Sequence, residues 1–324
     1  MEKIQQAIAK ARQMREAQLR EAAAAEGDAD GGTYGGTYGD AAGGDRAIAP
    51  AASPPSAPSA PAAPPARQAE KPRPPVTPEP ASERPGRDRV WAAIPEVSVA
   101  ARRLRRNRIL TGQGGKDSAD FDMIRTRILQ AQKANGWRRI AITSPEPGSG
   151  KSTLALNLAF SLARQPEQHT ILAEVDLRRP SLAKTLGLKQ GYNFAAVLGG
   201  AEAFEDNCCR IGQNLILTTN SGPSRNPSEL LQSDRAAEVL DAIETRFRPT
   251  IMLFDLPPML AGDDAMAFLS KVDATILVAA AEKTTVKQVD LCERDIASQT
   301  SVLGIVLNKC RYMDRDRSYG YDYD

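Results

Sequence analysis

Short runs of apolar residues recur through the last two thirds of the chain, and stretches of helix length separate them. The runs cover residues 139–143, 170–175, 214–217, 250–254, 274–280 and 302–307. Because apolar residues follow one another in these runs instead of alternating with polar ones, they predict strands that are covered on both faces. Strands of this kind alternating with helices predict an α/β fold with a doubly wound, mostly parallel sheet.

The first third of the chain has a different composition. Residues 27–96 consist largely of Ala, Gly, Ser and Pro, and 13 of the 23 prolines lie between Pro50 and Pro85. Such a segment cannot bury enough apolar surface to offset the entropy of ordering it, so we predict a disordered linker. Residues 1–26 fit a docking or coiled-coil helix and a solvated helix equally well. The folded domain is expected at 97–316, with a flexible tail at 317–324.

The charges of the chain are nearly balanced, at a formal net charge of +2. This balance does not indicate a nucleic-acid partner for the whole chain. Basic residues do cluster just before the predicted domain, at Arg102, Arg103, Arg105, Arg106 and Arg108. This arginine cluster fits an anionic membrane surface, a partner or nucleic acid, and it fits a solvated stretch that binds nothing equally well.

The sequence argues against several functions and locations. No apolar stretch approaches the roughly 18 residues needed to span a bilayer, and residues 1–26 lack the apolar centre of a secretion signal, so we expect a cytoplasmic protein. The cysteines form no Cys-x-x-Cys pair and are expected to be small buried residues; they are Cys208, Cys209, Cys292 and Cys310. The only histidine, His169, lies in a polar turn after Pro166, which leaves catalysis to carboxylates and a metal.

A phosphate-binding loop follows the first apolar run and precedes a helical one. Residues 144–153 have the sequence Ser-Pro-Glu-Pro-Gly-Ser-Gly-Lys-Ser-Thr. Glycines let several backbone N–H groups converge on a phosphate, and a helix N-terminus adds positive dipole. We predict that ATP contacts Pro147, Gly148, Ser149, Gly150, Lys151, Ser152 and Thr153. Lys151 is expected to reach the phosphates and Ser152 the Mg²⁺ ion, although Pro145 stands where the usual pattern has its first glycine.

Carboxylates follow two of the predicted strands. Asp176 ends one apolar run and Asp255 ends another, and ligands of such sheets lie at the carboxyl ends of strands. Because Mg²⁺ prefers oxygen ligands, we predict that Asp176 and Asp255 hold it together with Ser152. Glu174 lies two residues before Asp176, on the same face of an extended strand, and is expected to accept the proton of an incoming hydroxyl.

Tyrosines gather near the C-terminal end. Residues 317–324 have the sequence Arg-Ser-Tyr-Gly-Tyr-Asp-Tyr-Asp, with no helical pattern and no apolar group to bury. Exposed phenols in a flexible acidic tail are what a tyrosine kinase accepts as substrate. Beside a phosphate-binding loop, Tyr319, Tyr321 and Tyr323 are therefore candidate phosphoacceptors, and Tyr34 and Tyr38 of the linker are the next candidates.

With these motifs the chain resembles the bacterial tyrosine kinases of capsule and exopolysaccharide synthesis, in their separate cytosolic form. The resemblance covers residues 120–324 and rests on motifs that arrive in order. They are the loop at 144–153, Asp176-Leu-Arg-Arg-Pro180, Asn226-Pro-Ser-Glu-Leu-Leu231, Asp255-x-Pro-Pro258, Leu307-Asn-Lys309 and the terminal tyrosines. The resemblance implies a P-loop NTPase of MinD/ParA-like fold that uses ATP and Mg²⁺ and phosphorylates its own tyrosine tail.

The resemblance also implies further roles and partners. Asn308 is expected near the base of ATP, and Lys151, Asp176 and Asp255 in catalysis. A membrane-spanning polysaccharide co-polymerase is expected to activate the chain and recruit it to the inner face of the membrane. A homo-oligomer and a phosphatase that resets the tail are implied in the same way.

Two departures from that family leave other functions open. Glu174 stands where its first acidic motif has Asp, and aligning the family's ring-forming Glu-x-x-Arg-x-x-Arg on Arg125 puts Asp122 and Ala119 in the other places. The main alternative is a MinD/ParA-like ATPase switch that phosphorylates nothing, although those proteins have a second lysine where this chain has Glu146. A third is an adaptor of polysaccharide machinery that binds ATP only to order an interface.

Overall fold

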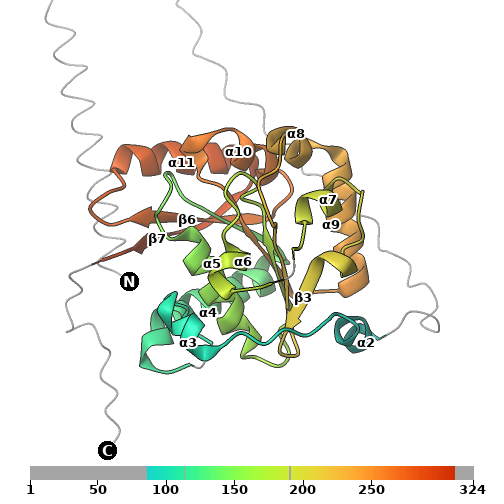
Figure 1. The fold of residues 1–324 in the computed structure, drawn as a ribbon. Coiled ribbons are helices and arrows are strands. Elements are labelled where there is room, and N and C mark those ends of the chain that lie inside the picture. Colours follow the sequence, from blue (N-terminus) through green and yellow to red (C-terminus); the bar gives the residue numbers. More distant parts are fainter. Residues whose placement is uncertain (1–85, 113, 190, 311–324) are drawn as a thin grey trace, which may run out of the picture. The chain divides into compact units, whose positions relative to one another are not determined.

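The computed structural model describes residues 86–112, 114–189 and 191–310 (Figure 1). Strands of this part form one sheet in the order β3-β4-β2-β5-β1-β6-β7. They are β1 (Arg139–Thr143), β2 (Thr170–Glu174), β3 (Cys208–Ile211), β4 (Leu215–Thr218), β5 (Ile251–Asp255), β6 (Ala274–Ala280) and β7 (Ser301–Asn308). Neighbouring strands are parallel except at one edge, where β3 pairs antiparallel with β4. The mostly parallel sheet is as the sequence predicts.

Helices cover both faces of the sheet. They are α2 (Arg87–Ala92), α3 (Ala101–Arg106), α4 (Ala119–Asn135), α5 (Lys151–Ala163), α6 (Leu182–Leu186), α7 (Phe194–Leu198), α8 (Pro227–Gln232), α9 (Asp234–Phe247), α10 (Asp264–Leu269) and α11 (Val286–Gln299). Two buried apolar clusters result, one beneath α3 to α6 and the other beneath α2 and α7 to α11. In β1, Ala141 belongs to the second cluster, while Ile140 and Ile142 belong to the first. This alternation explains why both sides of a central strand are apolar.

The folded part begins earlier than the composition of residues 27–96 predicts, which corrects the expected boundary at 97. Helix α2 places the Trp91 side chain in the core at 1 % exposure, and its Nε1 donates a hydrogen bond to the Phe247 carbonyl at 2.8 Å. Farther on, Val97 N donates to the Arg210 carbonyl, and Arg210 N donates to the Pro95 carbonyl. A segment that composition assigns to the linker is thus held by Trp91, by Ile94, which is also buried, and by the edge of β3.

The arginine cluster lies inside the folded part and not ahead of it. Helix α3 carries most of it, with Leu104 buried beneath and Arg102, Arg105 and Arg106 exposed. Residues 1–26, the linker tyrosines and the tail at 317–324 lie outside the described residues.

His169 is 8 % exposed and its ring meets Trp91 edge to face at 4.8 Å, so the ring is buried in the core. Cys310 is exposed, unlike the other three cysteines, which are buried as predicted.

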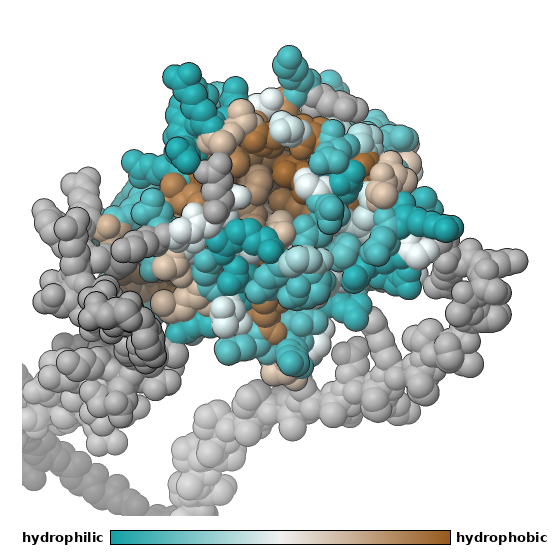
Figure 2. All heavy atoms as spheres, turned by 90° about the horizontal axis from the view of Figure 1, so that it is seen from below, coloured by the Kyte–Doolittle hydropathy of each residue, from teal (hydrophilic) through white to brown (hydrophobic). Residues whose placement is uncertain are grey.

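On the face seen from below, hydrophobic residues gather in one recess that hydrophilic residues surround (Figure 2).

Candidate active site

The loop between β1 and α5 has the backbone of a phosphate-binding loop. Strand β1 ends at Thr143 and helix α5 begins at Lys151. Gly148 and Gly150 have φ angles of 81° and 96°, a region where a side chain would be strained. A Cβ on Gly150 would in addition overlap Asn308 Nδ2. Position 145 does not have a positive φ, which explains how Pro145 replaces the usual glycine.

Neighbouring residues hold this loop in place. Ser149 Oγ donates to the Glu146 carbonyl at 3.0 Å, and Asn308 Nδ2 donates to the Ser149 carbonyl at 2.8 Å. The contact from Asn308 brings the end of β7 against the loop. Lys283 Nζ donates to the Pro147 carbonyl at 3.3 Å. The loop is therefore fixed by side chains from several elements before any ligand arrives, which lowers the cost of ordering it on binding.

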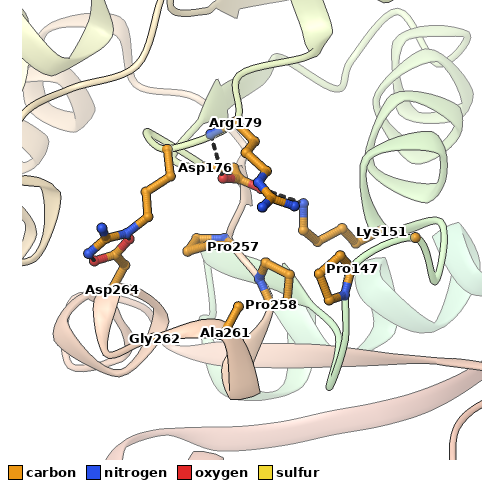
Figure 3. A pocket seen from close by; sticks show the side chains of 11 residues that line it. Pro147, Lys151, Asp176, Arg179, Pro257, Pro258, Ala261, Gly262 and Asp264 are labelled. Carbon is orange, nitrogen blue, oxygen red and sulfur yellow. Dashed lines mark hydrogen bonds and ion pairs between the residues drawn. The ribbon is translucent and has the colours of Figure 1, made fainter.

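Lys151 lies between the two predicted metal-side carboxylates. Its Nζ is 2.8 Å from Asp176 Oδ2 and 4.0 Å from Asp255 Oδ1, and Figure 3 shows Lys151 and Asp176 pointing toward one another. Burial alone would lower the pKa of Lys151, but the charges of Asp255 and Asp176 outweigh it and raise the pKa above its ordinary value. Lys151 is thus held as a cation where a phosphate group would meet it.

Asp255 is the residue that fits a metal ion best. It is fully buried at the end of β5, and neither carboxylate oxygen accepts a hydrogen bond from the described residues. Burial raises its pKa, which the charge of Lys151 and the nearby Ser152 hydroxyl partly oppose. A buried carboxylate that accepts no full hydrogen bond is costly unless a cation meets it, and Lys151 Nζ lies 4.0 Å away. The carboxylate of Asp255, next to the helix that carries Ser152, therefore fits Mg²⁺, which prefers oxygen ligands.

Glu174 does not occupy the position that the sequence predicts. Its Oε1 accepts from Leu182 N at 2.7 Å and from Ser181 N at 2.5 Å, and its Oε2 accepts from Asn220 N at 2.9 Å. The side chain is fully buried, does not line the pocket, and has its pKa raised by burial to about 7. We correct the expected role of Glu174 from proton acceptor to support of the backbone around α6.

The physical reason is that β2 ends before Asp176. Val175 N and Asp176 N both donate to the Asp255 carbonyl, at 2.9 and 3.0 Å. Two residues that face one partner form a bulge, which breaks the two-residue alternation of side chains along an extended strand. Glu174 and Asp176 therefore point to different places, and only Asp176 lines the pocket.

A cavity of about 260 Å³ opens beside Lys151 and Asp176. Its other lining residues come from the phosphate-binding loop, the loop after β2 and the segment after β5: Pro147, Gly148, Arg178, Arg179, Pro257, Pro258, Ala261, Gly262 and Asp264. Figure 3 shows Pro257, Pro258 and Ala261 below Asp176, and Pro147 beside Lys151. The sequence prediction of site residues did not include Arg178, Arg179 or Asp264, although the motif Asp176-Leu-Arg-Arg-Pro180 contains both arginines.

The structure thus brings together the residues that the sequence proposes for nucleotide binding. Loop residues 147–153, Asp176, Asp255 and Asn308 surround one end of β1, while the tyrosines of the tail lie outside the described residues. No helix in the described part of the chain is both long enough and apolar enough to cross a membrane.

Comparison with known proteins also identifies a nucleotide-binding domain. Residues 140–319 match the family described as "CobQ/CobB/MinD/ParA nucleotide binding domain". The tyrosine-protein kinase YwqD of Bacillus subtilis is 31 % identical over 222 residues, which cover 68 % of this chain and 92 % of YwqD. The tyrosine-protein kinase CpsD of Streptococcus agalactiae is 31 % identical, over 61 % of this chain and 85 % of CpsD.

Solved structures agree in fold. The VpsO kinase domain is 31 % identical and superimposes with a TM-score of 0.55, over 64 % of this chain and 98 % of that one. The chimerical protein CapA2B2 is 26 % identical with a TM-score of 0.57, over 69 % and 99 %. The chain therefore belongs to the CobQ/CobB/MinD/ParA nucleotide-binding family and, within it, to the bacterial tyrosine kinases.

Proposed function

We propose that this chain is an ATP-dependent tyrosine autokinase that phosphorylates its own C-terminal tyrosines. The observation that carries the proposal is the arrangement of Lys151, Asp176 and Asp255 around the start of α5, next to a cavity that is open to a second substrate. Pro147, Gly148 and Lys151 line one part of this cavity and would face the phosphates. Arg179, Pro257 and Pro258 line another part, outside the phosphate-binding loop, and this part is the proposed place of a phenol ring.

Each residue has a role in this proposal. Lys151 and the amides of residues 147–153 bind the phosphates, and Asn308 lies at the side of the base. Ser152, Asp176 and Asp255 would hold Mg²⁺, which supplies positive charge to the transferring phosphoryl group. In the transfer, the bond from the terminal phosphorus to the ADP oxygen breaks and a bond to the phenol oxygen forms. Asp176 lines the pocket and Glu174 does not, so Asp176 is the proposed acceptor of the phenol proton.

The proposed acceptors are Tyr319, Tyr321 and Tyr323, and the proposed setting is polysaccharide synthesis. Relatives that carry the names CapB, EpsB and CpsD are tyrosine-protein kinases or putative ones. We extend the proposal to a membrane-spanning co-polymerase that recruits the chain to the inner face of the membrane, and to a phosphatase that removes the tail phosphates.

A homo-oligomer is also part of the proposal. Strand β7 is an edge of the sheet, its eight residues carry no charge, and Ile305 and Leu307 are 45 % and 62 % exposed. Exposed apolar edge strands without charges are templates for pairing with another chain. This edge supports self-association, and size-exclusion chromatography with light scattering measures it.

The alternative of an ATPase switch is less well supported by the loop itself. Glu146 stands where the second lysine of such switches would be, and it accepts a hydrogen bond from Gln288 Nε2 of α11 at 2.8 Å. An acid that is tied to the protein's own helix cannot serve as a cation that crosses to a partner's phosphates.

Intact mass after incubation with Mg-ATP tests the acceptor assignment. We expect the wild-type chain to gain up to three phosphates of 80 Da each, and the variant with Tyr319, Tyr321 and Tyr323 all changed to Phe to gain none while still binding ATP. The same mass gain in the triple variant would show that the acceptors lie elsewhere, with Tyr34 and Tyr38 examined next.

A further inference from the structure

Two adjacent arginines in the loop after β2 differ in their contacts. Arg178 Nε and Nη2 donate to the two oxygens of Asp264, at 2.5 and 2.9 Å, and Ser228 Oγ donates to the same carboxylate. Asp264 is almost completely buried, so this fork of hydrogen bonds fixes the start of α10 against the loop. The guanidinium of Arg178 therefore has a structural role.

The side chain of Arg179 is not held in this way. Its backbone N donates to Asp176 Oδ1 at 3.1 Å, which fixes the position of its main chain. Its guanidinium makes no hydrogen bond or ion pair with any residue that the structure describes, is exposed, and lines the same cavity as Lys151 and Asp176. The site thus presents one free cation at its rim, on a backbone that is anchored to a reacting group.

The rest of the cavity favours an aromatic ring. Pro257, Pro258 and Ala261 line it, and Figure 3 shows them across the pocket from Asp176 and Arg179. A ring that lies against the prolines would have its hydroxyl toward Asp176, and its chain neighbours would pass Arg179. Arg179 can then form a charge-assisted pair with a carboxylate beside the ring.

The tail of this chain has that chemistry at two of its three tyrosines. Asp322 lies between Tyr321 and Tyr323, whereas Tyr319 has Ser318 and Gly320 as neighbours. We infer that Arg179 binds the carboxylate next to the acceptor, so that the site phosphorylates Tyr321 and Tyr323 in preference to Tyr319. This inference rests on the proposed function and adds which tyrosines the site selects.

The tail is long enough to reach a site of this kind. From Cys310, the last described residue, to Tyr321 is eleven residues, which span up to roughly 36 Å when extended. Its own site and that of a second copy are both compatible with this reach, and the inference holds for either.

The test creates a carboxylate where the tail lacks one. In the full chain, Gly320→Asp places an acid next to Tyr319, and Gly320→Asn is the matched uncharged control. Site-resolved mass spectrometry follows the initial rate at each tyrosine with Mg-ATP. We expect Gly320→Asp to raise the Tyr319 rate about five-fold and Gly320→Asn to leave it unchanged, because one partly screened charge pair is worth about 1 kcal/mol.

A second substitution assigns the effect to Arg179. In Arg179→Gln the gain from Gly320→Asp should disappear and the rates at Tyr321 and Tyr323 should fall to about that of Tyr319, whereas Arg179→Lys should keep part of the preference. High salt should weaken the preference in the wild type. Equal rates at the three wild-type tyrosines, or a Gly320→Asp gain that survives Arg179→Gln, would overturn the inference. An equal loss at all tyrosines with weaker ATP binding would do so too, because it would place Arg179 on the nucleotide.

A separate outcome concerns the proposed function alone. If the wild-type chain forms no phosphotyrosine, the kinase proposal fails while the contact can still be measured. A fluorescent peptide of residues 311–324 should then bind the full chain with Mg²⁺ and a non-hydrolysable ATP analogue. Arg179→Gln and a peptide with Asp322→Asn should each weaken binding, and together no more than either alone. Additive losses or no loss would overturn the contact.

Discussion

Charge compensation among Lys151, Asp176 and Asp255 decides what the site can bind. One cation faces two carboxylates, and Asp255 retains two buried oxygens without a donor. Without a ligand this is an incomplete set of interactions, since buried carboxylates need partners. A divalent cation supplies the missing positive charge, and a triphosphate bound to that cation can then take the place of a carboxylate as the partner of Lys151. The same residues therefore explain why the nucleotide and the metal should bind together.

Lys151→Met tests the cationic side of this set. Removing the ammonium group deletes a charge-assisted contact to phosphate, and we expect ATP affinity to fall about ten- to a hundred-fold. Titration with a fluorescent ATP analogue measures it. Lys151→Arg is the matched control, because it keeps the charge. Unchanged affinity in Lys151→Met would show that Lys151 does not contact the phosphates.

The raised pKa of Glu174 predicts that the stability of the folded chain depends on pH. Its pKa rises from its ordinary 4.5 to about 7 in the folded chain, mainly through burial. Its contribution to stability is therefore fully present below pH 4.5 and is lost as the pH rises through about 7. Glu174→Gln has no such titration. From pH 5.5 to pH 8 the free energy of unfolding of the wild type should fall by about 2 kcal/mol relative to this variant.

Urea unfolding of both proteins at the two pH values measures that difference. A difference that is independent of pH would show that Glu174 is charged throughout the range. Gln replaces one accepting oxygen with an NH2 donor, which weakens the contacts to the three backbone amides equally at both pH values. The change of the difference with pH therefore isolates the titration of the carboxyl group.

At the scale of elements, α2 carries a prediction about stability. Trp91 fills the space between His169 and Phe247, with ring centroids at 4.8 and 6.4 Å. Trp91→Ala should lower the free energy of unfolding by about 3–5 kcal/mol, because it leaves a cavity and an unpaired Phe247 carbonyl. Trp91→Phe fills most of the space and should cost less. A loss below 1 kcal/mol for Trp91→Ala would mean that α2 does not stabilise the core.

The elements also show how far the sequence predicts the fold. Apolar runs located β1 and β6 at their observed bounds and the other parallel strands to within one residue at each end, because strands buried on both faces must be apolar. Strand β3 was missed, since Cys208–Ile211 is short, lies at an edge and contains Arg210. Helix α2 was missed because its short apolar run, which includes Trp91, directly follows a long segment of linker composition.

Some residues of the site could be predicted from the sequence pattern, and others only from the structure. The phosphate-binding loop and the two aspartates follow from the composition of strand ends. The role of Glu174 could not be predicted, because it depends on a bulge at Val175 and Asp176 that period-two reasoning ignores. Arg178 and Arg179 are adjacent in the sequence, and only their contacts distinguish a structural residue from a free one.

At the scale of the whole molecule, the parallel sheet brings the site together from distant segments. The ends of β1, β2, β5 and β7 contribute Lys151, Asp176, Asp255 and Asn308 to one edge. Parallel strands with crossover helices place their carboxyl ends together, which is where such sheets bind ligands. The chain continues from β7 directly into the segment that carries the tyrosines, so catalytic site and proposed substrate are separated by a short length of chain.

The most direct test of the account is phosphotyrosine mapping by mass spectrometry after incubation of the purified chain with Mg-ATP. It is carried out alone and with the cytoplasmic segment of a candidate membrane partner, while ATP hydrolysis is followed in parallel. We predict phosphate on the tail tyrosines, lost in Lys151→Met. ATP hydrolysis without phosphotyrosine under both conditions would contradict the kinase proposal and favour an ATPase switch.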